Sequence, residues 1–150
     1  MSERPVVIRP LEANDRPAWE PLWKGYQTFY KVDLPPATND ETFRRLLDPA
    51  EPMFCLVATE GADMIGIVHF IFHRSTWTPE DYCYLQDLFT SEAARGKGVG
   101  RALIAGVVAR AKEHGSSRVY WLTHETNSQA MILYDQVAQK SGFLQYRIML

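Results

Sequence analysis

A glycine-rich turn at residues 95–101 is the stretch of this chain whose residue types suit phosphate binding. The turn contains Arg95, Gly96, Lys97, Gly98, Val99, Gly100 and Arg101. It follows an apolar run rich in strand-forming residues and precedes an amphipathic run that begins at Val99. The first N–H groups of a helix lack acceptors within the helix, and the helix dipole is positive there. A strand, a glycine turn and a helix start therefore predict a site for a phosphate-bearing ligand.

The spacing of the glycines excludes the two commonest nucleotide-binding motifs. A P-loop requires Gly-x-x-x-x-Gly-Lys-Ser/Thr, and the dinucleotide fingerprint requires Gly-x-Gly-x-x-Gly near the start of a βαβ unit. The pattern that matches is Arg-x-x-Gly-x-Gly, which resembles the pyrophosphate loop of the GNAT N-acetyltransferases, enzymes that use acetyl-coenzyme A (acetyl-CoA). A glycine turn that merely caps a helix is the alternative if this turn is considered alone.

A second motif follows at the distance that the GNAT family requires. Asn127, Ala130, Leu133 and Tyr134 have the spacing of the second half of the family signature, and Ser141-Gly142-Phe143 comes after them. The resemblance implies that Asn127, Ala130 and the helix that they begin hold the pantetheine arm of the cosubstrate. It also implies that Tyr134 is the general acid for the departing thiolate. Taken alone, Tyr134 would be a core aromatic on an amphipathic helix.

The strand before the glycine turn carries further implied roles. The resemblance implies that the backbone of Leu88, Phe89 and Thr90 binds pantetheine where the strand splays from its neighbour. Residues 84–89, YLQDLF, are similar to the same strand of the diamine (polyamine and thialysine) acetyltransferases. Residues 120–135 also resemble a related histone and polyamine acetyltransferase group. Where the diamine enzymes have Glu-Asp, this chain has Gln86-Asp87, so their proposed general base is an amide here.

The acceptor side is expected to attract a cation. Residues Gln86 and Asp87 point to opposite faces of a regular strand, so at most one reaches the attacking nitrogen unless the strand is distorted. We therefore expect an ordered water to take the amine's proton, with Asp87 or Asp33 attracting the acceptor. Tyr30 ends an aromatic stripe on the first helix and is a further candidate to line the acceptor pocket. His69 and His73 are interpreted as structural histidines beside the core.

The function that follows is acetyl transfer from acetyl-CoA to a primary amine of a small molecule, such as a polyamine, diamine or amino-acid-like compound. It would proceed by direct attack in a ternary complex and would make the protein an acyltransferase of class EC 2.3.1. Two alternatives stay open from the sequence: a non-catalytic acyl-CoA sensor or scaffold, and a protein or histone lysine acetyltransferase. Loss of the glutamate before Asp87 keeps the first alternative open.

Length and composition predict one ordinary globular domain spanning residues 1–150. The formal net charge of −2 is unlike that of a nucleic-acid binder. No stretch is long enough to span a membrane, no cysteine or histidine spacing matches a zinc site, and no metal is expected. Cys55 and Cys83 lie in apolar runs, which favours free thiols and a cytoplasmic location.

The predicted fold is α/β. The resemblance implies a single-domain GNAT-like fold with a central, mixed, mostly antiparallel, twisted sheet of about six strands and helices on both faces. Expected strands cover residues 6–9, 53–59, 64–72, 82–89, 118–123 and 143–150. Expected helices start near Pro17, at a Thr38–Glu41 capping box, at Val99, and at Asn127, the last reaching Lys140. The last strand would leave an apolar sheet edge, from which we predict a homodimer.

Overall fold

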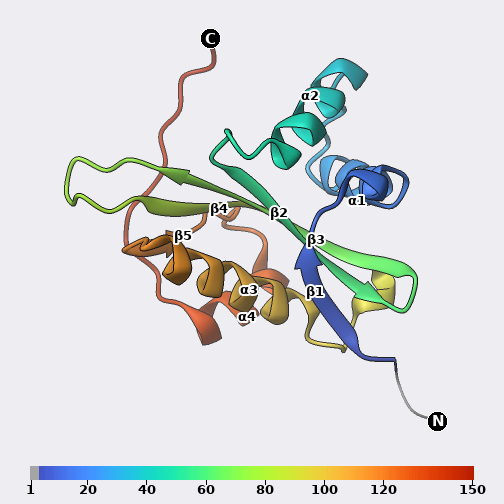
Figure 1. Ribbon diagram of the computed structural model, residues 1–150. Helices are drawn as coiled ribbons and strands as arrows, with labels where there is room; N and C mark the ends of the chain where they lie inside the picture. The colour runs from blue at the N-terminus through green and yellow to red at the C-terminus, as the bar shows by residue number, and fades with distance from the viewer. Residues whose placement is uncertain (1–3) are drawn as a thin grey trace.

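The computed structural model describes residues 4–150 and contains a five-stranded sheet between two layers of helices (Figure 1). The strands are β1 (Val6–Pro10), β2 (Met53–Glu60), β3 (Asp63–His73), β4 (Tyr82–Thr90) and β5 (Arg118–Tyr120), in that order across the sheet. Neighbouring strands are antiparallel except β4 and β5, which are parallel. The α-helices are α1 (Arg16–Phe29), α2 (Pro36–Leu47), α3 (Val99–His114) and α4 (Ser128–Val137), with short 3₁₀ turns at Ala13–Asp15 and Glu92–Ala94. The predicted α/β fold with a mixed sheet is confirmed.

The two faces of the sheet bury two separate apolar clusters, because successive side chains of a strand point to opposite faces. On one face Val68 and Phe70 of β3 pack with Leu103 of α3. On the other face Ile67 of β3 packs with Trp19 of α1. Figure 1 shows α1 and α2 on one side of the sheet and α3 and α4 on the other. This double cover explains why the central strands are apolar on both faces.

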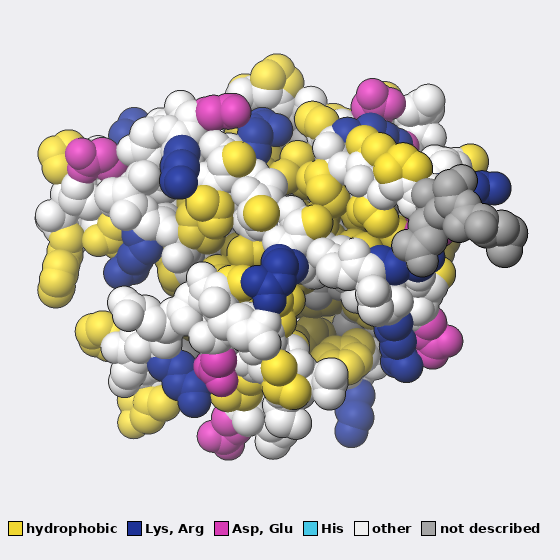
Figure 2. Space-filling model, turned by 90° about the horizontal axis from the view of Figure 1, so that it is seen from below, with side chains coloured by type: hydrophobic (Ala, Val, Ile, Leu, Met, Phe, Trp, Pro, Cys, Tyr) yellow, Lys and Arg dark blue, Asp and Glu magenta, His cyan; other side chains and the backbone are white. Residues whose placement is uncertain are grey.

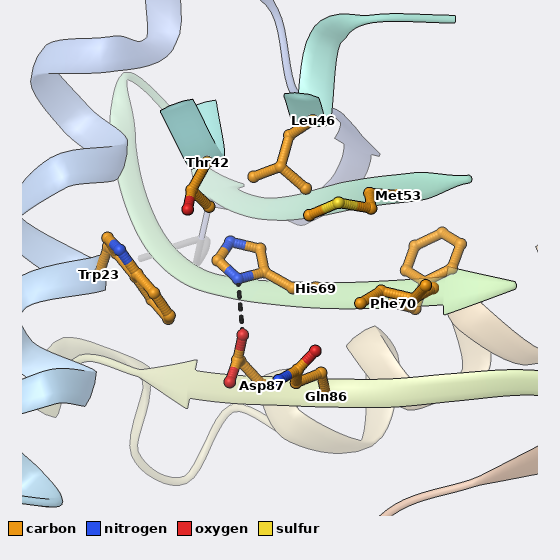
Figure 3. A pocket seen from close by; sticks show the side chains of 9 residues that line it. Trp23, Thr42, Leu46, Met53, His69, Phe70, Gln86 and Asp87 are labelled. Carbon is orange, nitrogen blue, oxygen red and sulfur yellow. Dashed lines mark hydrogen bonds and ion pairs between the residues drawn. The ribbon is translucent and has the colours of Figure 1, made fainter. Parts of the chain in front are cut away.

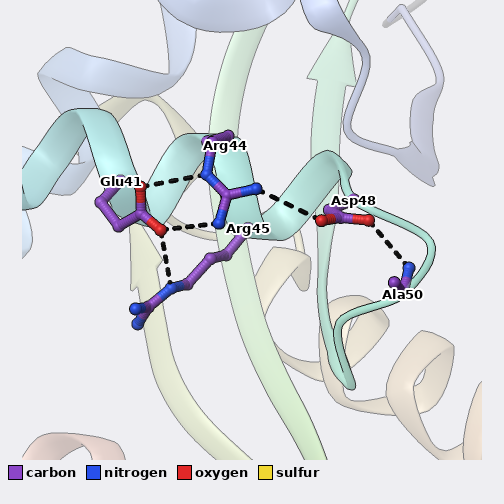
Figure 4. Close-up of polar contacts among 5 residues, drawn as sticks. All are labelled: Glu41, Arg44, Arg45, Asp48 and Ala50. Atoms are coloured by element: carbon purple, nitrogen blue, oxygen red, sulfur yellow. Dashed lines mark hydrogen bonds and ion pairs between the residues drawn. The ribbon is translucent and has the colours of Figure 1, made fainter.

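The start of α2 differs from the predicted capping box. The helix begins at Pro36 and has no side-chain cap, so Thr38 does not cap it. The Glu41 carboxylate instead accepts hydrogen bonds from Arg44 and Arg45, and Arg44 also donates to Asp48 (Figure 4). Two prolines at positions 35 and 36 already fix the backbone of the first turn. Glu41 is therefore free to join the exposed charge cluster on the outer face of the helix.

The expected last strand is wrong. Helix α4 ends at Val137 rather than at Lys140, and residues 138–150 form no helix or strand. The apolar side chains of this segment are exposed, with Phe143 at 86% and Ile148 at 87% of their full accessibility. Figure 1 shows the segment leading away from the sheet. The edge strand β5 has three residues instead of the expected six. It therefore has few backbone groups with which a further strand of the same chain could pair.

Within residues 4–150, no helix has the length and apolar character needed to cross a bilayer. The same residues contain no group of three or more His, Cys, Asp and Glu side chains placed to hold a metal ion. Cys55 and Cys83 are both buried free thiols, and burial raises the pKa of each.

Candidate active site

Strand β4 has a strand neighbour on both edges for only part of its length. It pairs with β3 from Tyr82 to Thr90 but with β5 only from Tyr82 to Tyr84. The splay expected from the sequence is therefore present. Residues 88–90, which were expected to bind pantetheine, lie in the part of β4 whose second edge has no strand partner. Their backbone groups on that edge are open to an extended ligand.

The glycine turn adopts a backbone conformation that requires glycine. Gly96 and Gly98 have φ angles of 74° and 68°, in the left-handed region, and a β-carbon on either would meet no atom of the protein within 4 Å. In α3 the N–H of Ala102 donates to the carbonyl of Gly98. The amides of residues 99–101 precede this first bond and lie at the positive end of the helix. The turn thus combines open space with unpaired donors.

Gly100 has a different function from the two glycines before it. Its φ is not in the left-handed region, and a β-carbon there would lie 3.3 Å from the side chain of Leu133. It therefore permits close packing of α3 on α4. Arg101 adds a hydrogen bond to Gln136, also on α4. The helix that contains Tyr134 is thereby fixed relative to the glycine turn.

The cationic side chains near the turn are not equivalent. Lys97 forms an ion pair with Glu60 of β2, with Nζ–O distances of 2.7 and 2.9 Å, whereas Arg95 forms no ion pair with any residue that the structure describes. Lys97 is therefore held toward β2. Seen from below, the molecule has a hollow with hydrophobic side chains inside and Lys and Arg side chains around it (Figure 2). Such a surface suits a ligand with an apolar arm and negative charges.

Tyr134 lies at the junction of α4 with the sheet. Its ring contacts Trp121 with a centroid distance of 5.4 Å, and partial burial raises the pKa of its hydroxyl, with a smaller contribution from Tyr30. The hydroxyl is therefore protonated at neutral pH. Asn127 is at the N-cap position, as expected, but its side chain donates to Thr123 Oγ1 at 3.2 Å instead of capping α4. Ala130 lies half-buried one turn before Tyr134.

A β-bulge in β4 decides where the acceptor residues point. His69 of β3 is opposite Asp87, and the next residue, Phe70, is opposite Leu85, so Gln86 is an extra residue without a partner. Leu85 belongs to the cluster under α3, yet Asp87 faces α1. In a regular strand these two residues would share a face. The bulge therefore overturns the expectation that Gln86 and Asp87 point to opposite faces.

A cavity of about 200 Å³ lies beside Asp87, between the sheet and the helices α1 and α2. Its lining residues are Trp23, Thr42, Leu46, Met53, His69, Phe70, Ile71, Gln86 and Asp87. Figure 3 shows Gln86 and Asp87 on the same side of β4, with Asp87 bound to His69. Drug-sized ligands commonly occupy roughly 300–1,000 Å³, so this space suits a smaller molecule.

Tyrosines surround the Asp87 carboxylate. Burial, and next the negative charge of Asp87, raise the pKa values of Tyr26, Tyr30 and Tyr84. The charge of Asp87 acts on Tyr30, but Tyr30 does not line the cavity, so its place in the acceptor site stays a prediction. Asp33 is exposed in the connection between α1 and α2 and does not line the cavity. Of the two carboxylates proposed from the sequence, the structure brings only Asp87 into the cavity.

Sequence reasoning missed three neighbours of Asp87. The sequence analysis interpreted His69 as a structural histidine. It gave Tyr26, in the aromatic stripe of the first helix, and Tyr84, in the YLQDLF strand motif, no role in the site. The signal that could have found Tyr26 is its position between Trp23 and Tyr30 on one helix face. The contact of His69 with Asp87 depends on the bulge, and no local pattern predicts it.

Comparison with known proteins is consistent with this geometry. The sequence pattern of the Acetyltransferase (GNAT) family matches residues 19–138. The chain is 41% identical over 144 residues to the D-amino-acid N-acetyltransferase of Saccharomyces cerevisiae, covering 95% of this chain and 89% of that protein. It is 29% identical over 133 residues to the thialysine N-epsilon-acetyltransferase of Mus musculus, covering 79% and 78%. Its fold resembles that of the aminoglycoside N-acetyltransferase AAC(6')-Iy in complex with CoA, with a TM-score of 0.85, 15% identity and coverage of 99% and 97%.

The conformation of the glycine turn generates a binding prediction. Valine at position 98 would force a β-branched residue into the left-handed region, so we expect Gly98→Val to weaken CoA binding by about tenfold or more, or about 1.4 kcal/mol. Isothermal titration calorimetry with CoA measures this. Gly115→Val is the matched control, because Gly115 also has a positive φ, of 82°, but ends α3 at the opposite end from the turn. Unchanged affinity in a folded Gly98→Val protein would contradict the assignment of the turn.

Proposed function

Because the chain belongs to the Acetyltransferase (GNAT) family, we propose that it transfers an acetyl group from acetyl-CoA to the primary amine of a small cationic or amino-acid-like molecule. Family membership makes it an N-acetyltransferase, an acyltransferase, with acetyl-CoA as its cosubstrate. The observation that carries the proposal is that β4, whose second edge has no strand partner beyond Tyr84, holds Asp87 and leads into the glycine turn, which packs at Gly100 against the helix of Tyr134.

The cosubstrate would lie along the open edge of β4. Its diphosphate would accept hydrogen bonds from the amides at the start of α3, with Arg95 and Arg101 adding positive charge. Its pantetheine arm would extend beside Leu88–Thr90 and the start of α4 at Asn127 and Ala130. This path follows the open edge of β4 from the glycine turn toward Asp87.

Tyr134 is assigned the role of general acid. In the transfer step the amine nitrogen forms a bond to the thioester carbonyl carbon, the C–S bond breaks, and the sulfur leaves as a thiolate that needs a proton. Because burial raises the pKa of Tyr134, its hydroxyl carries that proton at neutral pH. Tyr30 contributes to the raised pKa of Tyr134, and Asp87 contributes to that of Tyr30, which supports an acid on the side where the acceptor would enter.

Asp87 is assigned to acceptor binding. Its carboxylate lines the cavity together with the indole of Trp23, a side chain that favours a cation. Gln86 has no basic atom, so the amine's proton would leave through ordered water. An amine is mostly protonated at neutral pH, and only its neutral form attacks, so kcat/KM should rise with pH.

The acceptor would be an amino-acid-like or polyamine-like compound. Two relatives are named for D-amino acids and for thialysine, which are small molecules with a primary amine. A cavity of about 200 Å³ suits such acceptors better than it suits a bulky one.

We expect Tyr134→Phe to lower kcat by about 10²-fold or more, because a positioned general acid typically contributes that much. The affinity for acetyl-CoA should change little, since the hydroxyl matters as charge develops on sulfur. In the wild type, the raised pKa of Tyr134 predicts that kcat is retained up to about pH 10 and falls above it. Thiol release in steady-state assays measures kcat. Tyr146→Phe, at a side chain that is 92% exposed, is the control, and full activity of Tyr134→Phe would remove this tyrosine from the mechanism.

Asp87→Asn should reduce kcat/KM by about tenfold or more for acceptors with a second positive charge, because hydrogen bonds to charged groups contribute about 1.5–3 kcal/mol. Spermidine and thialysine are the test acceptors, and a monoamine without another charge is the reference. Asp33→Asn is the matched control, since its carboxylate is exposed away from the cavity. If Asp87→Asn leaves every acceptor unchanged, Asp87 is not the acceptor site.

A homodimer remains our proposal, now with a different geometric basis. Most side chains of residues 143–150 are apolar and exposed, nothing in residues 4–150 covers them, and a second copy would bury them. We expect sedimentation to show a dimer at micromolar concentration and a monomer when the chain is cut after Lys140. A monomeric full-length protein would contradict the dimer.

We also propose a cytoplasmic location. The supporting observation is that Cys55 and Cys83 are free thiols in apolar surroundings, the form that a reducing compartment maintains.

A further inference from the structure

A chain of hydrogen bonds leads from the core of the protein to the acceptor carboxylate. Trp19 of α1 is completely buried, and its indole Nε1–H donates to Nε2 of His69 at 3.1 Å. The other ring nitrogen of His69, Nδ1, lies 3.0 Å from Oδ2 of Asp87. His69 is 4% exposed, and the Asp87 side chain is 13% exposed. The three groups therefore form a line from a fully buried indole to a carboxylate at the cavity.

The chemistry of the first member fixes the state of the second. An indole nitrogen can donate a hydrogen bond but cannot accept one, so Nε2 of His69 must offer a lone pair. The single proton of the neutral ring is then on Nδ1, from which it is donated to Asp87. A doubly protonated ring would direct an N–H group at the N–H group of Trp19. Trp19 thus disfavours the imidazolium.

We propose that His69 is a positioning residue, held by Trp19 as the neutral Nδ1–H tautomer, that orients Asp87 and preserves its negative charge in the acceptor site. This inference rests on the proposed function, in which Asp87 attracts a cationic acceptor. With a neutral His69 the pair has a charge of −1, whereas an imidazolium would make it zero. His69 binds Oδ2 alone, which leaves Oδ1 for other donors.

The remaining titratable groups around the pair do not supply a competing cation. Those that face it are Tyr26 and Tyr30 from α1, Cys55 from β2 and Tyr84 from β4. The pKa of each is raised, so all four are neutral at pH 7. Asp15 is the other carboxylate whose charge raises the pKa of Cys55, and it forms an ion pair with Arg9. No Lys or Arg within residues 4–150 forms an ion pair with Asp87.

The tautomer can be observed directly in the wild-type protein. Nitrogen-15 NMR distinguishes a protonated ring nitrogen from one with a lone pair, and the chain has only four histidines. We expect the His69 signals to show a proton on Nδ1 and a lone pair on Nε2 from pH 6 to 8. His114 is the internal reference, because its Nε2 faces Asp81 and should carry the proton. His69→Gln assigns the signals by removing one set.

Two matched substitutions test the charge argument. Trp19→Phe removes the Nε1–H and keeps an aromatic ring, so no donor of α1 then opposes a second proton on Nε2 of His69. We expect the kcat/KM of spermidine, divided by that of a monoamine without a second charge, to fall about tenfold at pH 6 and much less at pH 8.5. Phe43→Leu is the control, because Phe43 is buried in the same apolar cluster and contacts Trp19, but it donates no hydrogen bond and does not line the cavity. It should leave the ratio unchanged.

The outcomes separate this inference from the proposed function. A wild-type His69 with its proton on Nε2, or on both nitrogens at pH 7, would overturn the inference even if the enzyme acetylates spermidine. An equal pH-dependent fall in Trp19→Phe and Phe43→Leu would also overturn it, since only packing would then matter. If the expected tautomer is present but wild type acetylates no amine, the proposed function fails while the assignment of His69 stands. His69→Gln offers a neutral donor to Asp87 and should retain part of the preference for spermidine.

Discussion

The extra residue in β4 is the constraint on which the site depends. Leu85 and Asp87 are two residues apart, yet one lies in the apolar cluster under α3 and the other faces α1. Without the bulge at Gln86, the side chain of Asp87 would point into the apolar cluster, without its contact to His69. An unpaired carboxylate buried there would cost several kcal/mol. The bulge therefore keeps the carboxylate of Asp87 out of the apolar cluster and directs it to the cavity.

The bulge also divides β4 into a structural half and a functional half. Residues 82–84 have strand neighbours on both edges, and the open edge begins at Leu85, next to the bulge. A bulge bends a strand and increases its local twist, so the open edge and the turned carboxylate are linked features of one distortion. The glycine turn follows directly after this half of the strand. One continuous stretch of backbone thus sets the separation between Asp87, the proposed acceptor carboxylate, and the amides at the start of α3.

Local features of the site could be predicted from the sequence, whereas features that depend on strand pairing could not. Gly96 and Gly98 signal a left-handed turn because few other residues adopt that conformation. Asn127 and Tyr134 are seven residues apart, two turns of one helix, so their relation is also local. The bulge at Gln86 depends on which β3 residues pair with its neighbours in β4. The sequence of one strand does not determine that register. Residues 143–150 show the converse, because their apolar pattern predicts a strand, but β5 is too short to pair with it.

Helix α1 explains how an apolar core becomes a polar site without a break in packing. Its aromatic stripe changes steadily in exposure, from Trp19 at 0% and Trp23 at 7% to Tyr30 at 40%. Each indole at the buried end directs its single N–H to a specific acceptor, His69 or Asn39, since an unpaired buried donor would be costly. The hydroxyl groups toward the exposed end lie near Asp87, and Tyr30 is also near Tyr134. The stripe therefore extends from the core toward Asp87 and Tyr134, the proposed acceptor carboxylate and the proposed general acid, with groups that stay neutral at pH 7. In the proposed reaction, an acceptor that enters at the Tyr30 end would meet aromatic side chains before it meets Asp87. Within residues 4–150, no Lys or Arg forms an ion pair with that carboxylate.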